Sequence, residues 1–351
     1  MIGDDDLRAG VAAGIVTEAQ ATRLLTLSQT RAGTRAALTG DDEPFELFRG
    51  FSEIFISVGL VILLSGLMSL VSLSGHVLAI SLAGAALAVL LALYFTRRRR
   101  MTLPSIVLSI AFAQAVSVAI LWIVIGNADT IPGTSTVILI GGVVVAALAV
   151  WYWAFRIPFT MFLIGLTVLA VILLSISGAA PVAIFNDWAN LFDLGGSLIA
   201  RGTLGFGIVA FIAGMAFDMR DPHRLGRFAA SGFWLHLLAA PALVNTVALT
   251  FLKMDSTRGY ILLGLSLALI TLLALVIDRR SFLTAGIAYL GILLGLILVP
   301  DGGSPIRWAW LLILLGGFVT LIGAFWTQWR SAILRALPDF PGKSRLPPYG
   351  A

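Results

Sequence analysis

The sequence predicts an all-α, polytopic transmembrane helical bundle of about ten spans, preceded by a short N-terminal cytoplasmic helical hairpin. Of the 351 residues, 59% are hydrophobic and only 12% are charged, against about 45–50% and about 25% in soluble domains. Apolar runs of about 20 residues recur along the chain, and in hydrocarbon such runs must be helices because no water is present to hydrogen-bond their peptide groups. These observations exclude soluble enzymes and soluble binding modules.

The apolar runs define ten predicted spans, and most of them are long enough to cross about 30 Å of hydrocarbon. They cover residues 52–72, 76–95, 104–126, 135–155, 158–177, 203–217, 228–251, 260–277, 282–299 and 308–327. The sixth is unusually short, because only sixteen residues separate Arg201 from Asp218, a rise of about 24 Å. We therefore divide the chain into a hairpin and acidic linker (1–50), a ten-span domain (51–328) and a cytoplasmic Pro-rich tail (329–351).

The distribution of basic residues predicts the orientation of the spans. With the N-terminus in the cytoplasm, 19 of the 23 Lys and Arg residues fall on the cytoplasmic side. The run Arg97–Arg100 is the densest group among them. Because cytoplasmic loops carry the excess of Lys and Arg, we expect both termini in the cytoplasm.

The first 50 residues predict two short helices. The first carries Leu7 and Val11 and ends near Gly14, and Thr17 and Gln20 form a capping box that opens the second. Helices this short cannot bury a core of their own. We therefore expect the hairpin to dock on its own membrane domain, on a second copy of the chain or on another protein.

Polar side chains inside spans are the strongest candidates for a functional site, since they are costly in hydrocarbon. Gln114 is central in the third span, His236 is expected near the middle of the seventh, and Asn245 follows it. Pro241, between the last two, should kink the helix. Two interpretations stay open for Gln114, His236 and Asn245: a substrate or proton site, or hydrogen bonds that hold helices together.

A second candidate is an outer gate formed by Asp187, Trp188 and Arg201. The loop 178–202 holds apolar residues on one helical face and polar residues on the other, which predicts a helix in the outer interface. Next to a short span, such a helix could close a cavity. The alternative is a plain interfacial helix that covers the bundle.

Charged residues at span ends are expected to pair locally. Glu53 lies one turn after Arg49, and the two should form an ion pair. Asp218, Asp221 and His223 contain metal-ligand atoms, but arginines alternate with them and should occupy the carboxylates. We predict no metal site and no cofactor.

The sequence lacks the residues and motifs that several kinds of catalysis require. The chain has no cysteine, so thiolate catalysis and cysteine metal sites are impossible. No nucleophile elbow, zinc-protease helix or phosphate-binding loop is present. We therefore expect a protein that is not an enzyme and that binds no nucleic acid.

Two segments, Asp42 to Phe55 and Phe233 to Pro241, together with the hairpin, resemble an uncharacterised family of proteobacterial polytopic inner-membrane proteins. The resemblance implies an inner-membrane location and carries no activity. Two functions from different classes remain. We favour a carrier or permease for a small solute; the alternative is a non-transporting scaffold or regulator that acts on partners through the hairpin.

Overall fold

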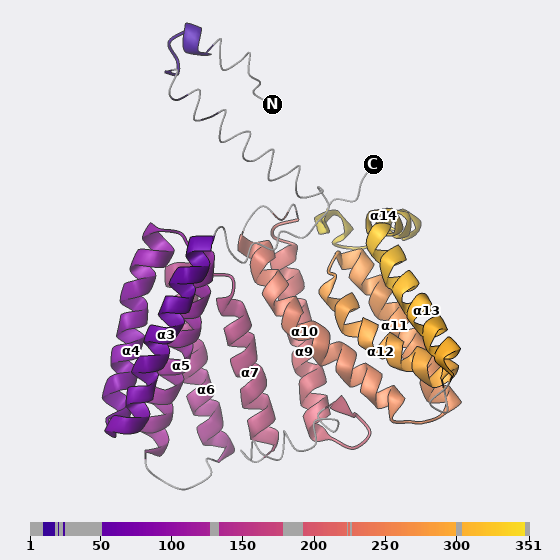
Figure 1. Ribbon diagram of the computed structural model, residues 1–351, viewed down its shortest axis with the longest axis horizontal. Helices are drawn as coiled ribbons and strands as arrows, with labels where there is room; N and C mark the ends of the chain where they lie inside the picture. Colours follow the sequence, from indigo (N-terminus) through magenta and orange to yellow (C-terminus); the bar gives the residue numbers. More distant parts are fainter. Residues whose placement is uncertain are drawn as a thin grey trace. The chain divides into compact units, whose positions relative to one another are not determined.

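A computed structural model of the protein describes residues 10–17, 20, 24, 51–126, 133–177, 192–222, 224, 227–299 and 304–347. Most of these residues are helical, and no β-strand occurs among them (Figure 1). The predicted all-α polytopic fold is therefore confirmed. The chain divides into two compact units, 1–46 and 47–351.

The described part of the larger unit is a series of helices. They are α3 (Phe51–Ser74), α4 (Val77–Ala92), α5 (Thr102–Ile125), α6 (Thr134–Phe155), α7 (Thr160–Ile176), α9 (Leu198–Asp218), α10 (Arg227–Leu252), α11 (Thr257–Ile277), α12 (Ser281–Leu298), α13 (Pro305–Ala324) and α14 (Trp326–Ala336). A π-helical turn, Leu93–Arg98, extends α4, and a short 3-10 turn, Lys343–Arg345, follows α14.

Each of the ten predicted spans falls on one of the helices α3 to α13. Eight of these helices are long and apolar enough to cross a membrane, and α7 and α12 are shorter apolar helices. The protein is therefore a multi-pass membrane protein. Whether α7 and α12 also cross the bilayer stays a prediction, and α7, with 17 residues, spans about 26 Å, close to the thickness of the hydrocarbon.

The prediction of a short sixth span was wrong. Helix α9 has 21 residues and contains both Arg201 and Asp218, which the sequence analysis had taken as the limits of the span. Its N-terminus lies at Ser197, whose Oγ accepts the backbone N–H of Ile199 at 3.1 Å. Arg201 is exposed in the first turn, where a long side chain reaches the interface and does not interrupt the helix.

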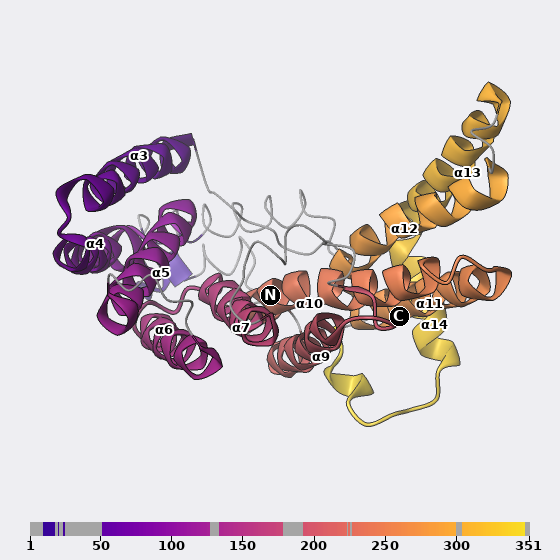
Figure 2. The same cartoon turned by 90° about the horizontal axis from the view of Figure 1, so that it is seen from below.

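Helix α10 is the centre of the membrane domain. It packs against α7, α9, α11 and α12, and Figure 2 shows it between α7 and α11 with α9 alongside. Over half of its most apolar window is buried, compared with a third or less in the other seven long helices. Its buried residues are mostly small (Ala, Gly, Ser and Thr), and such residues allow the backbones of membrane helices to approach closely.

Two groups of buried apolar side chains hold the helices together. One comes from α3 to α7 and includes Leu108, Leu148 and Trp151. The other comes mainly from α9 to α12 and includes Leu263 and Phe282. Phe162 of α7 packs against both groups, so α7 joins the first helices of the domain to the last.

Glu53 has partners that the sequence analysis did not predict. Its carboxylate is buried and accepts the backbone N–H groups of Thr102 (3.2 Å) and Leu103 (3.3 Å) at the start of α5. A carboxylate stabilises a helix N-terminus because the first N–H groups have no partner within the helix. Arg49 lies outside the described residues.

The smaller unit confirms the predicted capping box. The backbone N–H of Thr17 donates to Gln20 Oε1 at 3.0 Å, and that of Gln20 donates to Thr17 Oγ1 at 3.3 Å. The chain turns at Gly14, which has a positive φ of 70°, where the first helix was expected to end. Leu7 lies outside the described residues.

Candidate functional site

An acidic side chain is buried where α9 packs closely against α10. Asp218 is the last residue of α9 and is 5% exposed. A Cβ atom on Gly214 would lie 2.9 Å from Cε1 and Nε2 of His236, and a Cβ atom on Gly232 would collide with the Asp218 carboxylate. Glycine at these two positions therefore permits the approach that brings Asp218 to His236.

His236 is completely buried in α10, with 0% exposure. Its Nε2 atom lies 3.1 Å from Oδ2 of Asp218. The residue is nine positions after Arg227, where α10 begins, which corresponds to about 13 Å along the helix. It thus lies nearer to the end of α10 that begins at Arg227 than the predicted mid-span position.

Arg279 completes the group from the connection between α11 and α12. Its side chain is 2% exposed, Nε donates to Asp218 Oδ2 at 3.0 Å, and Nη2 donates to Asp218 Oδ1 at 2.5 Å. Nη2 also donates to the backbone carbonyl of Ala229 on α10, at 3.0 Å. The guanidinium and the carboxylate therefore form a bidentate pair. We refer to Asp218, His236 and Arg279 as the buried polar cluster.

Aromatic rings cover the histidine on its apolar side. The ring centroid of Phe211 on α9 lies 5.5 Å from that of His236, and the centroid of Phe282 on α12 lies 5.9 Å from it. The two phenylalanine rings also contact each other edge to face, 5.7 Å apart. The imidazole therefore has a charged pair on one side and apolar rings on the other.

A second acidic residue extends the polar network toward α14. Asp278, the neighbour of Arg279, accepts a hydrogen bond from Trp326 Nε1 at 2.7 Å and forms an ion pair with Arg224 at 2.9 Å. Arg330 lies at 3.9 Å from the same carboxylate and donates to the backbone carbonyl of Pro347 at 2.6 Å. The ends of α9 to α12 are thus tied to α14 and to the chain that follows it.

The electrostatics of the cluster depend on complete pairing. Asp218 and Arg279 carry opposite charges, and a buried charge without its partner is strongly destabilising. In membrane segments, ionisable side chains of this kind are rare, pair with one another and mark ion or substrate pathways and proton relays. His236 supplies an imidazole, the side chain that proteins use most often for proton transfer. Among the described residues, no group of three or more acidic or histidine side chains could hold a metal ion.

The structure does not bring the predicted polar site together. Gln114 is exposed on α5 and lines a hollow of about 350 Å³ between α3, α4 and α5, whereas His236 is surrounded by α9, α10 and α12. Asn245 is half-buried on α10, nine residues beyond His236, or about 13 Å along the helix. Only His236 of the three belongs to the buried polar cluster. Helix α10 continues through Pro241, which is exposed.

Only one of the three residues of the predicted outer gate lies in the part of the chain that the structure describes. Asp187 and Trp188 lie outside the described residues, and Arg201 is an exposed residue of α9. The segment before α9 is attached to the distal end of α10: Thr250 Oγ1 donates to the carbonyl of Phe192 at 3.2 Å and accepts the N–H of Leu194 at 3.0 Å. Lys253 Nζ lies 3.5 Å from the carboxylate of Asp193.

The sequence analysis missed two of the three cluster residues. Asp218 was taken as the limit of the sixth span and as a charged residue at a span end, and Arg279 was counted only among the 19 basic residues expected on the cytoplasmic side. One feature of the sequence could have indicated them: both residues adjoin the ends of apolar runs. A helix that extends slightly beyond such a run can bury the charged residue at its end. Comparison with known proteins adds no function, because no protein-family model, curated protein or solved structure matches the chain.

Proposed function

We propose that this membrane protein is a carrier for a small solute and that the buried polar cluster is its proton-responsive site. The observation that supports the proposal is the burial of three ionisable side chains among apolar helices: Asp218 on α9, His236 on α10 and Arg279 between α11 and α12. Such a cluster is not required to anchor a protein in a bilayer, and it connects α9, α10 and the α11–α12 connection at one level. A movement that separated α9 from α10 would expose the imidazole and its carboxylate partner together.

We further propose that the protein lies in the bacterial inner membrane with both termini in the cytoplasm, and that it has no catalytic role. The excess of Lys and Arg on one side supports this orientation. In it, the buried polar cluster lies toward the cytoplasmic half of the bilayer, because Asp218 and Arg279 stand at helix ends on the basic side.

The test is flux into proteoliposomes between pH 5.5 and 8. A trapped pH-sensitive dye reports proton movement, and a panel of labelled amino acids and organic acids reports solute uptake. Both are measured for the wild type, His236→Gln and His236→Leu. Gln keeps a hydrogen-bonding side chain but gains no proton in this range. We expect His236→Gln to melt within a few degrees of the wild type and to lose the pH dependence of flux.

The second candidate function is a non-transporting scaffold or regulator. The observation that favours it is the hairpin unit, in which the apolar side chains of Ile15 and Leu24 are 78% and 45% exposed and therefore suited to contact another surface. In that case, His236 holds helices together. Identical flux profiles for the wild type and His236→Gln, with a lowered melting temperature for His236→Leu alone, would support this alternative and contradict the carrier.

A further inference from the structure

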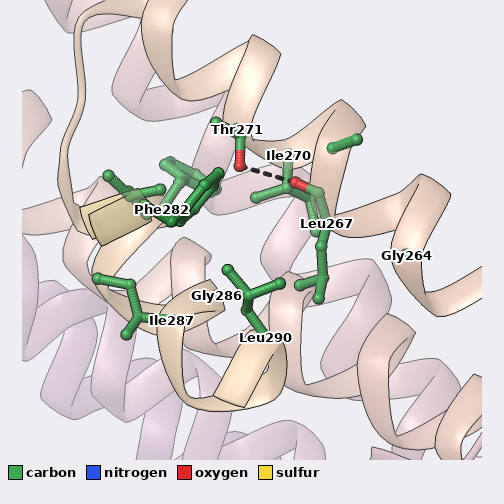
Figure 3. Close-up of a pocket in the computed structure, with 11 residues that line it drawn as sticks. Gly264, Leu267, Ile270, Thr271, Phe282, Gly286, Ile287 and Leu290 are labelled. Atoms are coloured by element: carbon green, nitrogen blue, oxygen red, sulfur yellow. Dashed lines mark hydrogen bonds between the residues drawn. The ribbon is translucent and has the colours of Figure 1, made fainter. Parts of the chain in front are cut away.

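An apolar hollow of about 300 Å³ lies between α11, α12 and α13. Its lining includes Leu267 on α11, Phe282 and Leu290 on α12, and Phe318 on α13, and Figure 3 shows the residues of α11 and α12 directed into it. The hydroxyl of Thr271, also in the lining, donates to the carbonyl of Leu267 at 2.8 Å. The lining therefore offers a ligand an almost entirely apolar surface.

Two glycines leave this space open although the packing does not require glycine. A Cβ atom on Gly264 would lie 3.6 Å from the nearest side chain, and one on Gly286 would lie 3.7 Å from Leu267. Both distances are ordinary van der Waals contacts, so alanine or a larger residue would fit. The absent side chains account for part of the hollow, which opens beside the exposed residues Ala268 and Phe318.

The surroundings of the hollow determine what can fill it. Helices α11 and α13 are two of the long apolar helices, so the opening faces hydrocarbon. Water gains nothing in an apolar space, whereas an acyl chain lying along the helices gains dispersion contacts with the side chains of α11, α12 and α13. From Phe282 to Leu290, the wall follows α12 for about 12 Å, in the direction in which bilayer chains run.

A positive charge lies at the end of the same wall. Arg280 directly precedes α12, two residues before Phe282, and its guanidinium lies 5.4 Å from the ring centroid of Trp326. Arg280 therefore lies at the level where α12 begins, and lipid phosphates lie near the ends of membrane-spanning helices. Basic residues beside a space between membrane helices are characteristic of sites for anionic lipid headgroups.

We propose that this hollow binds one anionic phospholipid, with an acyl chain along α12 between α11 and α13 and with the phosphate at Arg280. The site is separate from the buried polar cluster, although Phe282 both lines the hollow and contacts the His236 ring. The bound lipid would fill the space that Gly264 and Gly286 leave open. The proposal does not depend on transport, and it is tested with lipid binding alone.

The experiment is a lipid titration of the delipidated full-length protein in detergent, with melting temperature as the readout. Phosphatidylglycerol is compared with phosphatidylcholine of identical chains and with inorganic phosphate. We expect only phosphatidylglycerol to raise the melting temperature. Arg280→Gln should weaken its half-saturation about fivefold, as expected for one basic residue near a lipid surface, and Gly286→Leu should abolish the shift by filling the hollow.

Matched variants control for charge and bulk. Arg335→Gln removes a positive charge from an exposed position on α14, and Gly316→Leu adds the same side chain at a position on α13 with open space around it. Both should keep the wild-type response. If Gly286→Leu does not fold, Ala268→Leu at the mouth replaces it.

Three results would overturn the proposal. The first is an equal shift with phosphatidylcholine or with inorganic phosphate, and the second is an unchanged lipid response in the variants that fill the hollow. The third is a dimer of the wild type that Gly286→Leu converts to a monomer without a change in lipid response, which would identify the hollow as a contact between two copies of the chain.

Discussion

Replacing Arg279 by leucine is the simplest test of the buried polar cluster, because leucine removes one charge and leaves an apolar side chain at the position. Arg279 donates two hydrogen bonds to the carboxylate of Asp218 and one to the carbonyl of Ala229. Hydrogen bonds to charged groups contribute about 1.5–3 kcal/mol each, and the loss of one partner of a buried ion pair costs about 3–5 kcal/mol. We therefore expect Arg279→Leu to lower the free energy of unfolding by about 3–5 kcal/mol.

The double variant separates charge burial from the loss of packing. In Asp218→Asn/Arg279→Leu neither charge remains, so the loss should be smaller than the sum of the two single losses by about 2 kcal/mol or more. Ordinary interhelical hydrogen bonds in membrane proteins contribute about 0.6 kcal/mol, too little to produce such a coupling. The free energy of unfolding is measured for all four proteins by denaturant titration in mixed micelles.

The control is Arg258→Leu, at an exposed position near the start of α11, which should change the free energy of unfolding by no more than about 0.5 kcal/mol. Additive losses in the double variant, with a coupling below about 0.5 kcal/mol, would refute the reasoning. They would mean that Asp218 and Arg279 do not form a dehydrated pair in the membrane.

Four further predictions concern the contacts around this core. Gly214→Ala should cost about 1–3 kcal/mol by overpacking against His236, while Gly205→Ala, where nothing lies within 4 Å, should be neutral or stabilising in the same unfolding titration. Glu53→Gln keeps an acceptor for the N–H groups of α5 and should cost about 0.3–1 kcal/mol, less than Glu53→Leu; an equal loss in both would contradict this role. Deletion of residues 1–40 should leave membrane insertion intact and remove a partner or dimer contact, which unchanged size and unchanged co-purifying proteins would disprove. Reporter fusions should give an external signal after residues 75, 129, 190, 255 and 303 and a cytoplasmic signal after 99 and 223; one reversed signal between correct ones would remove a pair of spans.

The fold was largely predictable because the length of an apolar run can be determined from consecutive residues alone. A run of about 20 apolar residues in hydrocarbon has only the helix available to satisfy its peptide groups, so the positions of α3 to α13 followed from composition alone. The residues at which the helices begin and end were harder to predict. Arg201 and Asp218 were taken as limits of a span, but a long side chain can reach the interface from inside a helix, and a paired carboxylate can be buried at its last turn.

The site was predictable only in part, because it depends on contacts between distant segments. His236 stood out as an ionisable residue within an apolar run. The other two members of the buried polar cluster, Asp218 and Arg279, are 18 residues earlier and 43 residues later in the chain, and nothing local to either residue indicates which helix it faces. Gly214 and Gly232 illustrate the same difficulty, since each is one of 36 glycines, and its importance is visible only when the opposing helix is placed.

The proposed carrier requires that the buried polar cluster become accessible to water in one of its states, and cysteine labelling measures this directly. The chain has no native cysteine, so Ser231→Cys gives a single reporter. This nearly isosteric change is at a completely buried position of α10, one residue before Gly232, where the Asp218 carboxylate lies against α10. Labelling by a membrane-impermeant maleimide is compared with that of Arg220→Cys, which is exposed, and of Ala248→Cys, which is buried in the distal part of α10. The account predicts that Ser231→Cys reacts from one side of the membrane, more slowly than Arg220→Cys and faster than Ala248→Cys, at a rate that changes between pH 5.5 and 8. A rate equal to that of Ala248→Cys from both sides and at every pH would contradict it.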